Sequence, residues 1–260
     1  MINVDTVYRT VLLLLNKEQR GYLTPDEFNK TATKVQLEIF EQYFDELNQQ
    51  LRIPQSEFDY SDRQIDVDDK ISMFKCLGSC VYLTSKFKLP ETDSLSGGTS
   101  VVYDNNPASD EFAFYRLGTI IYTGNNDIEL QRLQRNEFYN IDRSDLTAPS
   151  ENFPVYLYES GKLIVKPSSI TSGLKASFLR KPKDIVWGYD TGSLGQFIFN
   201  PSLTTTPGSG VRTQHFELHP SEQSNVINRV LFYSGVIIKD PQVAQAAAMQ
   251  IQQEEANKKS

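Results

Sequence analysis

The spacing of apolar residues changes twice along this 260-residue chain, and this change constrains the fold more than any other feature. Up to about residue 75, apolar residues recur every three or four positions, which indicates amphipathic helices. From about Cys80 to Leu218, short β-branched and aromatic runs alternate with Gly, Pro, Asn and Ser, which indicates strands and turns. Helical spacing returns after Ser221. We therefore expect an α+β fold with an N-terminal helical region, a central, mostly antiparallel β region and C-terminal helices.

The same changes in residue pattern divide the chain into three expected regions. Residues 1–78 form the N-terminal helical region, and residues 79–219 form a β-rich region with long loops. Residues 220–260 form C-terminal helices that pack on the N-terminal helices and on partner subunits. The loops at 93–111 and 201–214 are polar and rich in Gly, Ser and Thr, so we expect them to be mobile or ordered by a neighbour.

Individual elements can be predicted inside these regions. A second helix is expected to begin near Thr24 and to end before Pro54, and a third, short helix is expected to include Ile71 to Phe74. The run VYLYESGKLIV predicts a hairpin that turns at Ser160 and Gly161. The apolar faces of the first two helices are formed by Val4, Val7, Tyr8, Val11, Leu12 and Leu15 and by Phe28, Val35, Ile39, Phe40, Phe44 and Leu47.

The stretch NKEQRGYLTPDEF, from Asn16 to Phe28, has the spacing of a calcium-binding EF-hand loop. Such a loop needs oxygen ligands at its first, third and fifth positions, but the fifth position here is Arg20, a cation. Helix capping explains the remaining matches, with Gly21 ending one helix in a left-handed conformation. Thr24, Pro25 and Glu27 then start the next helix as a capping box with proline at its first position. We expect no calcium site.

Two other motifs suggest chemistry only weakly. The Asp-Thr-Gly of YDTGS, Tyr189 to Ser193, matches an aspartic-protease signature, but the surrounding glycines favour a turn between strands. Two pairs of residues have side chains that can bind zinc, but the spacing within each pair does not match a structural zinc site. Burial of the thiols explains the cysteines better. The two pairs are Cys76 with Cys80, and His215 with His219. We expect no catalytic activity, no metal and no cofactor.

Charge limits the partners. The chain has 26 Lys/Arg and 33 Asp/Glu, and residues 1–70 alone carry 8 and 14 of these, a net of −6 out of −7. This balance argues against broad nucleic-acid coating or an anionic membrane as the main partner, although DNA passing through a channel remains compatible with it. Two cysteines and no basic, cleavable leader lead us to expect a soluble protein made inside the cell.

The C-terminal helices carry the expected partner surface. Asp240 and Pro241 mark the start of a final helix that is rich in Ala and Gln and has few large apolar residues. Such a helix has little to hold it on a core, so we expect it to contact a partner. The expected oligomer or partner interface consists of Phe232, Tyr233, Val236, Ile237, Ile238, Val243, Met249 and Ile251.

Several stretches together resemble a family of virion structural proteins from crAss-like and related tailed phages. The likeness covers nearly the whole chain and is densest at both ends. The stretches that carry it are VYRTVLLLLNKEQRGYLTPDEFN and VQLEIFEQYF near the start, PVYLYESGKLIVKP and FLRKPKDIVWGY in the middle, and FELHPSEQSNVINRVLFYSGVIIKDPQVAQ near the end.

The resemblance implies a head–tail connector, a ring or adaptor subunit below the portal in the virion neck, which assembles in the host cytoplasm. Proteins of this kind commonly form twelvefold rings around the DNA channel. The implied partners are further copies of the chain, the portal protein, neighbouring ring or tail proteins, and genomic DNA that passes without sequence-specific binding; no membrane partner is implied. The alternative is a tail-side module that binds a host receptor or glycan through its β region.

Overall fold

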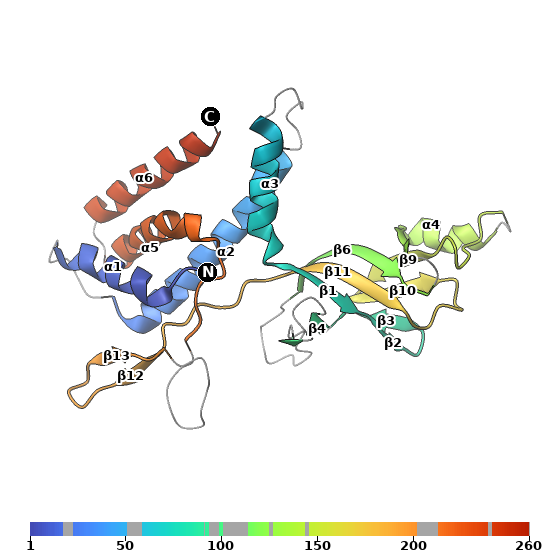
Figure 1. Ribbon diagram of the computed structural model, residues 1–260, viewed down its shortest axis with the longest axis horizontal. Helices are drawn as coiled ribbons and strands as arrows, with labels where there is room; N and C mark the ends of the chain where they lie inside the picture. Colours follow the sequence, from blue (N-terminus) through green and yellow to red (C-terminus); the bar gives the residue numbers. More distant parts are fainter. Residues whose placement is uncertain are drawn as a thin grey trace. The chain divides into compact units, whose positions relative to one another are not determined.

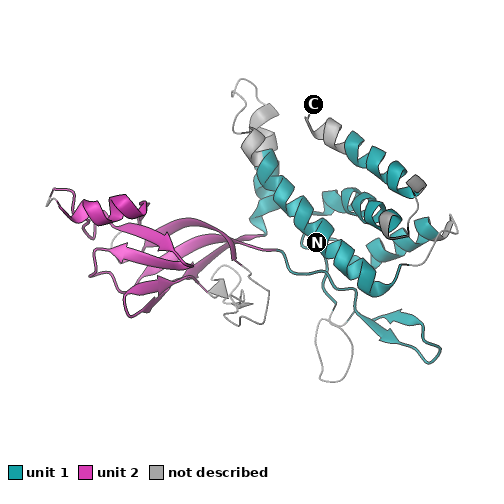
Figure 2. Ribbon diagram, turned by 180° about the vertical axis from the view of Figure 1, so that it is seen from behind, with its two compact units in different colours: residues 1–73, 182–260 teal, residues 74–181 magenta. Residues whose placement is uncertain are grey.

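The computed structural model describes residues 1–17, 23–50, 59–90, 92–93, 99–100, 114–124, 127–143, 146–201, 213–238 and 241–259. The chain forms two compact units, shown in different colours in Figure 2. The helical unit combines Met1–Met73 with Pro182–Ser260, and the β unit is Phe74–Lys181. N-terminal helices, central strands that are mainly antiparallel and C-terminal helices confirm the expected α+β class.

The helical unit is built around five long helices. Helix α5 lies between α6 on one side and α1 with α2 on the other, and α3 packs against α2 (Figure 1). The apolar faces predicted for α1 and α2 form its core, except that Leu12 is half-buried and the side chain of Leu47 lies outside the described part. The bounds are α1 (Val4–Lys17), α2 (Pro25–Gln50), α3 (Asp59–Ser72), α5 (Gln223–Ile238) and α6 (Pro241–Lys259).

Two predictions about helix positions were wrong. Helix α3 occupies the acidic stretch before Ile71 and ends at Ser72, so Phe74 lies outside it. The sequence pattern of this helix is weak, because Val67 and Ile71 are its only buried residues among those whose burial is described. The sequence also suggests Ser221 as the cap of α5, but Ser221 lies inside a short 3-10 turn, η2 (Pro220–Glu222), and α5 begins after it at Gln223.

The β unit is a sandwich of two sheets that share one apolar core. The four-stranded sheet has the order β1-β11-β6-β7 and the five-stranded sheet the order β2-β3-β10-β9-β8. All described pairings are antiparallel except β8 with β9. The core takes Ile120 and Leu174 from the first sheet and Phe87 and Leu163 from the second. On the outer face of the second sheet, Phe138 of α4 (Arg135–Asn140) packs against β9.

The strands of the β unit are short, as their spacing in the sequence predicts. Those of the four-stranded sheet are β1 (Lys75–Ser79), β6 (Phe114–Tyr122), β7 (Ile128–Glu129) and β11 (Leu174–Arg180). Those of the five-stranded sheet are β2 (Val81–Leu83), β3 (Lys86–Lys88), β8 (Gln131–Arg132), β9 (Val155–Glu159) and β10 (Lys162–Lys166). The unit also contains β4 (Thr92–Asp93), β5 (Thr99–Ser100) and the 3-10 turn η1 (Ile141–Arg143).

The hairpin predicted from VYLYESGKLIV is formed by β9 and β10. Glu159 pairs directly with Lys162, so only Ser160 and Gly161 form the turn. Both residues have positive φ angles, 52° and 70°, as a type I′ turn requires.

The boundaries between the units differ from those expected. Residues 74–78 belong to the β unit, and residues 182–219 belong to the helical unit rather than to the β-rich region. The segment after β11 is extended, as its composition suggests. Its backbone bonds to side chains of α2, and Val186 forms an isolated antiparallel bridge with Gln214. A two-stranded hairpin follows, consisting of β12 (Tyr189–Thr191) and β13 (Phe197–Phe199), and it projects from the helices (Figures 1 and 2).

Candidate functional site

The turn into α2 has the hydrogen bonds of a capping box. The backbone N–H of Thr24 donates to the Glu27 carboxylate at 3.0 Å, and the backbone N–H of Glu27 donates to Thr24 Oγ1 at 3.4 Å. The hydroxyl of Thr24 also donates to this carboxylate at 2.7 Å. These hydrogen bonds from Thr24 hold the pKa of Glu27 below its ordinary value. Pro25 is the first residue of α2, and Gly21 lies outside the described residues.

The candidate metal ligands have separate structural roles. His215 Nδ1 lies 3.4 Å from the backbone N–H of Val4, which donates to it at the start of α1, and His219 Nδ1 accepts from the backbone N–H of Ser221 in η2. Cys76 and Cys80 are not joined in a disulfide and are buried in the β unit, where burial raises the pKa of Cys80 to about 12. Within the described ranges, no three His, Cys, Asp or Glu residues gather as metal ligands would.

Asp190 of the Asp-Thr-Gly motif lies on the exposed β12–β13 hairpin. Its carboxylate accepts a hydrogen bond from the side-chain amide of Asn200 at 2.9 Å. An aspartic protease instead needs two carboxylates that share a proton in a buried site. The turn predicted for this stretch joins β12 to β13, and Gly195 in it has a positive φ angle of 78°.

The residues expected at a C-terminal interface have different environments. Tyr233 contacts α2, because its hydroxyl donates to Glu38 at 2.6 Å and Lys34 Nζ lies 4.1 Å from the ring centroid. Phe232, Val243 and Ile251 are half-buried, while Met249 is 69% exposed. The side chains of Val236, Ile237 and Ile238 lie outside the described part of α5. Among the predicted interface residues whose side chains the structure describes, Met249 is thus the most exposed.

Helix α6 packs closely on α5 despite its lack of large apolar residues. A Cβ atom on Gly235 would lie 2.9 Å from the backbone nitrogen of Ala244 and 3.2 Å from Val243 Cγ1. Ala247 is buried one turn further along α6. Small residues at the contact therefore let the two helix backbones approach each other, which supplies the support that α6 could not obtain from large side chains.

A buried polar network joins α2, α3 and α5. The carboxylate of Glu222 accepts from Lys70 Nζ at 2.9 Å and from the Asn225 amide at 3.0 Å. Arg229 continues the network by donating to Asn225 Oδ1 at 2.8 Å and to Gln42 Oε1 at 3.0 Å. Because an unpaired buried charge is costly, these contacts fix the alignment of the three helices.

One polar atom beside this network lacks a hydrogen-bond partner in the described part of the chain. It is the hydroxyl of Tyr43, which is almost fully buried in α2. Burial is the main cause that raises the pKa of Tyr43, and the nearby Glu222 carboxylate adds to the effect. The hydroxyl therefore stays protonated, and no hydrogen bond in the described part of the chain offsets the free-energy cost of removing it from water.

A polar stripe on α2 holds the extended segment that leads to the hairpin. Asn29, Thr33 and Gln36 lie on one face of α2, at spacings of four and three residues. Their side chains bond to the backbone of 183–187 at distances of 2.7 to 3.0 Å. Gln36 also accepts from the backbone N–H of Glu217 at 2.8 Å, so it connects two extended segments.

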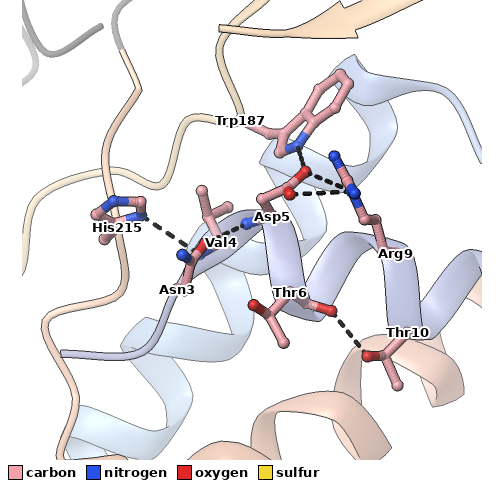
Figure 3. Close-up of polar contacts among 8 residues, drawn as sticks. All are labelled: Asn3, Val4, Asp5, Thr6, Arg9, Thr10, Trp187 and His215. Carbon is pink, nitrogen blue, oxygen red and sulfur yellow. Dashed lines mark hydrogen bonds and ion pairs between the residues drawn. The ribbon is translucent and has the colours of Figure 1, made fainter. Parts of the chain in front are cut away.

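Trp187 anchors the base of the hairpin to α1 (Figure 3). Its indole N–H donates to Asp5 Oδ1 at 3.0 Å, and Arg9 pairs with the same carboxylate at 2.9 Å. The centroid of the Trp187 ring lies 4.5 Å from that of Tyr8. The Trp187 ring also stacks on Tyr189 and Phe199, at centroid distances of 5.8 and 5.7 Å. The hairpin therefore leaves the helical unit from a rigid aromatic base.

Beyond this base, the hairpin exposes apolar side chains. Leu194 at the tip is 90% exposed, and Ile198 in β13 is 50% exposed. In the β unit, Val81 and Leu83 of β2 are 52% and 48% exposed. The loops at 93–111 and 201–214 lie mostly outside the described residues.

Neither the scan against models of protein families nor the search of curated proteins finds a match to this chain. None of the helices that the structure describes has both the length and the apolar composition that a membrane span requires.

Sequence reasoning did not identify the hairpin or the α2 stripe as features of interest. The sequence gives only a weak signal for the stripe: Asn29, Thr33 and Gln36 recur at helical spacing, but α2 also contains other uncharged polar residues such as Thr31 and Gln42. For the hairpin, the sequence indicated a turn at YDTGS and a β-branched and aromatic run, QFIFN, but neither signal distinguishes an exposed strand from a buried one.

Proposed function

We propose that this protein is a non-enzymatic structural subunit of a tailed-phage virion. It acts as one copy in an oligomeric ring or adaptor of the head–tail assembly, below the portal and around the DNA channel. The observation that carries this proposal is the exposure of large apolar side chains on secondary structure in both units, including Leu194 and Ile198 in the hairpin and Val81 and Leu83 in β2. Contiguous exposed apolar side chains commonly mark surfaces that a partner covers, and Val81 and Leu83 lie on one face of β2.

The charge distribution supports the same proposal. Residues 74–181 carry 12 Lys/Arg and 12 Asp/Glu, so the whole net charge of −7 belongs to the helical unit. An acidic wall repels the phosphate backbone. A ring that presents its helical units to the channel would therefore let DNA pass without gripping it.

The C-terminal helix is the proposed contact with the portal or a neighbouring ring. Deletion of residues 241–260 tests this docking, but it also removes the helix that packs on Gly235. Met249→Glu is the sharper test, because this side chain is exposed and its replacement leaves the α5–α6 contact in place. Gln250→Glu, at the next exposed position, is the matched control.

A density map of the virion neck tests the function as a whole. We expect the two-unit chain to be traceable in a ring beneath the portal, and Met249→Glu to reduce the number of tailed particles while Gln250→Glu does not. A neck in which this chain is absent would refute the proposal.

The alternative is a tail-side module that binds a host receptor or glycan. It is favoured by exposed aromatic side chains in the β unit, Tyr139 of α4 and Phe153, which is 78% exposed. Binding of the purified protein to host surface material, lost on Phe153→Ala and retained on Leu146→Ala, would support this alternative.

A further inference from the structure

Two exposed hairpins in different units of this chain have complementary faces. The first is β12–β13, where direct cross-strand pairing places Asp190 and Ile198 side by side on one face. Its other face, with Tyr189 and Phe199, stacks on Trp187. The face with Asp190 and Ile198 is therefore the one turned away from the aromatic base. It carries the Asp190 carboxylate, which also accepts from the Asn200 amide, on one strand and an aliphatic side chain on the other.

The second is β2–β3, at the edge of the five-stranded sheet. Pairing places Val81 opposite Lys88 and Leu83 opposite Lys86, so β2 contributes aliphatic side chains to one face and β3 contributes lysines. Lys162 of β10 pairs with Lys88 and extends the basic row. The opposite face of this hairpin holds Tyr82 and the buried Phe87.

We infer that the β12–β13 hairpin of one copy packs face to face on the β2–β3 hairpin of a second copy. The side chains on one face of each hairpin form two columns, one from each strand. Because neighbouring strands are about 4.8 Å apart in any sheet, the two columns of one hairpin have the same spacing as the two columns of the other. When Ile198 lies on Val81 and Leu83, Asp190 lies on the lysine column. Apolar side chains then cover one another, and the charges that face each other are opposite in sign.

Charge identifies the second copy as the occupant. Residues 189–199, which form the β12–β13 hairpin, carry one aspartate and no Lys or Arg, while residues 80–90 carry two lysines and no Asp or Glu. An edge strand with exposed apolar residues and no charge of its own is also prone to pairing with another chain. The open face of each hairpin therefore has its complement on the other unit of an identical chain.

This contact joins two different surfaces, so it can continue from copy to copy. Contacts of this kind close into rings when the rotation between copies allows it. The inference specifies how neighbouring copies in the proposed ring contact each other. It rests on the proposed function only for the closure of the ring, because the contact itself requires only a second copy of the chain.

Disulfide trapping tests the contact directly. Ile198→Cys and Leu83→Cys are prepared as separate full-length variants, each retaining the buried Cys76 and Cys80, and are oxidised alone and as a mixture. We expect a linked dimer only in the mixture, and the parent chain to stay unlinked. Self-linking of Ile198→Cys alone, or monomers throughout, would overturn the inference. A double variant that links only within one chain would overturn it as well.

Association measured by sedimentation equilibrium provides a second readout. Ile198→Glu should weaken self-association at least about tenfold, because it replaces a buried aliphatic contact with a charge. Asp190→Lys and Lys86→Glu should each weaken it about twofold to fivefold, and together restore it. Lys175→Glu, an exposed lysine of the other sheet, is the control and should change nothing.

The outcomes separate this inference from the proposed function. If the protein is absent from virion necks but the mixed disulfide forms, the function is wrong and the contact stands. If the neck contains a ring of this chain and Ile198→Glu assembles it normally, the contact is wrong and the function stands.

Discussion

The indole nitrogen of Trp187 lies 3.0 Å from Asp5 Oδ1, although 182 positions separate the two residues in the sequence. This hydrogen bond connects the first turn of α1 with the segment that enters the β12–β13 hairpin (Figure 3). Since Trp187 is the single tryptophan of the chain and is buried, its fluorescence reports on this junction.

Asp5→Ala should destabilise the protein by about 2 kcal/mol, because it leaves the buried indole N–H without its charged acceptor. The measurement is urea unfolding followed by the emission of Trp187. Arg9→Ala is the matched control, since it removes only an ion pair whose arginine side chain is 71% exposed. That change should cost less than about 0.5 kcal/mol, and equal effects of the two variants would contradict the proposed anchor.

Tyr43→Phe should stabilise the protein by about 1 kcal/mol, because it removes a buried hydroxyl that has no hydrogen-bond partner in the described part of the chain. Tyr8→Phe is the counterpart, since the Tyr8 hydroxyl donates to the carbonyl of Leu23 at 3.0 Å. It should destabilise the protein by about 1 kcal/mol. Opposite signs in denaturant titrations of the two variants are the expected result, and a loss of stability in both would contradict it.

Lys70→Met should cost about 3 kcal/mol, because it leaves the Glu222 carboxylate buried without its cationic partner. Adding Glu222→Gln should recover much of the loss, since the uncompensated charge disappears. Thermal unfolding of the two single variants and the double variant measures this coupling. Additive losses would mean that the two groups do not interact.

The capping box makes stability depend on pH in the acid range. Because the folded pKa of Glu27 is lowered, its contribution is complete above the ordinary value of 4.5 and is lost as the pH falls through the lower folded value. Thr24→Ala should cost about 1 kcal/mol at neutral pH, and Thr24→Ser much less. Unfolding curves of Glu27→Gln should show a weaker decline in acid than those of the parent.

Gly235→Ala distinguishes helix propensity from helix packing. In an exposed helix, this change stabilises by about 1 kcal/mol. In α5, the new Cβ would lie 2.9 Å from the Ala244 backbone nitrogen, so we expect a net loss of stability and the detachment of α6. Proteolysis of α6 and thermal unfolding measure these effects. A gain in stability would mean that α6 does not pack on Gly235.

Periodicity determined which parts of the fold were predictable. The cores of α1 and α2 follow from apolar residues at helical spacing, and the β9–β10 hairpin follows from Ser160 and Gly161 between two alternating runs. A third helix was expected around Ile71, but the start of α3 at Asp59 was not predicted, because this stretch is rich in charged residues and Val67 and Ile71 alone form too short an apolar pattern.

The partners of the extended segments were not predictable. The run from Lys183 to Trp187 has the composition of a strand, yet its backbone bonds to side chains of α2 about 150 residues away. A local pattern shows that a segment is extended, but it does not tell which distant donor or acceptor it meets. For the same reason, sequence alone pointed to the C-terminal helices as the contact surface and overlooked the open face with Asp190 and Ile198.

The β unit interrupts the helical unit, and its two ends lie side by side, with the N–H of Arg180 donating to the carbonyl of Phe74 at 2.9 Å. During synthesis, the β unit can therefore close as soon as β11 has left the ribosome. Helices α1 and α2 are made first but must wait for α5, the helix that covers their apolar faces. Because domains fold as units while the chain emerges, the earliest part of this protein completes its packing only after the β unit has been made.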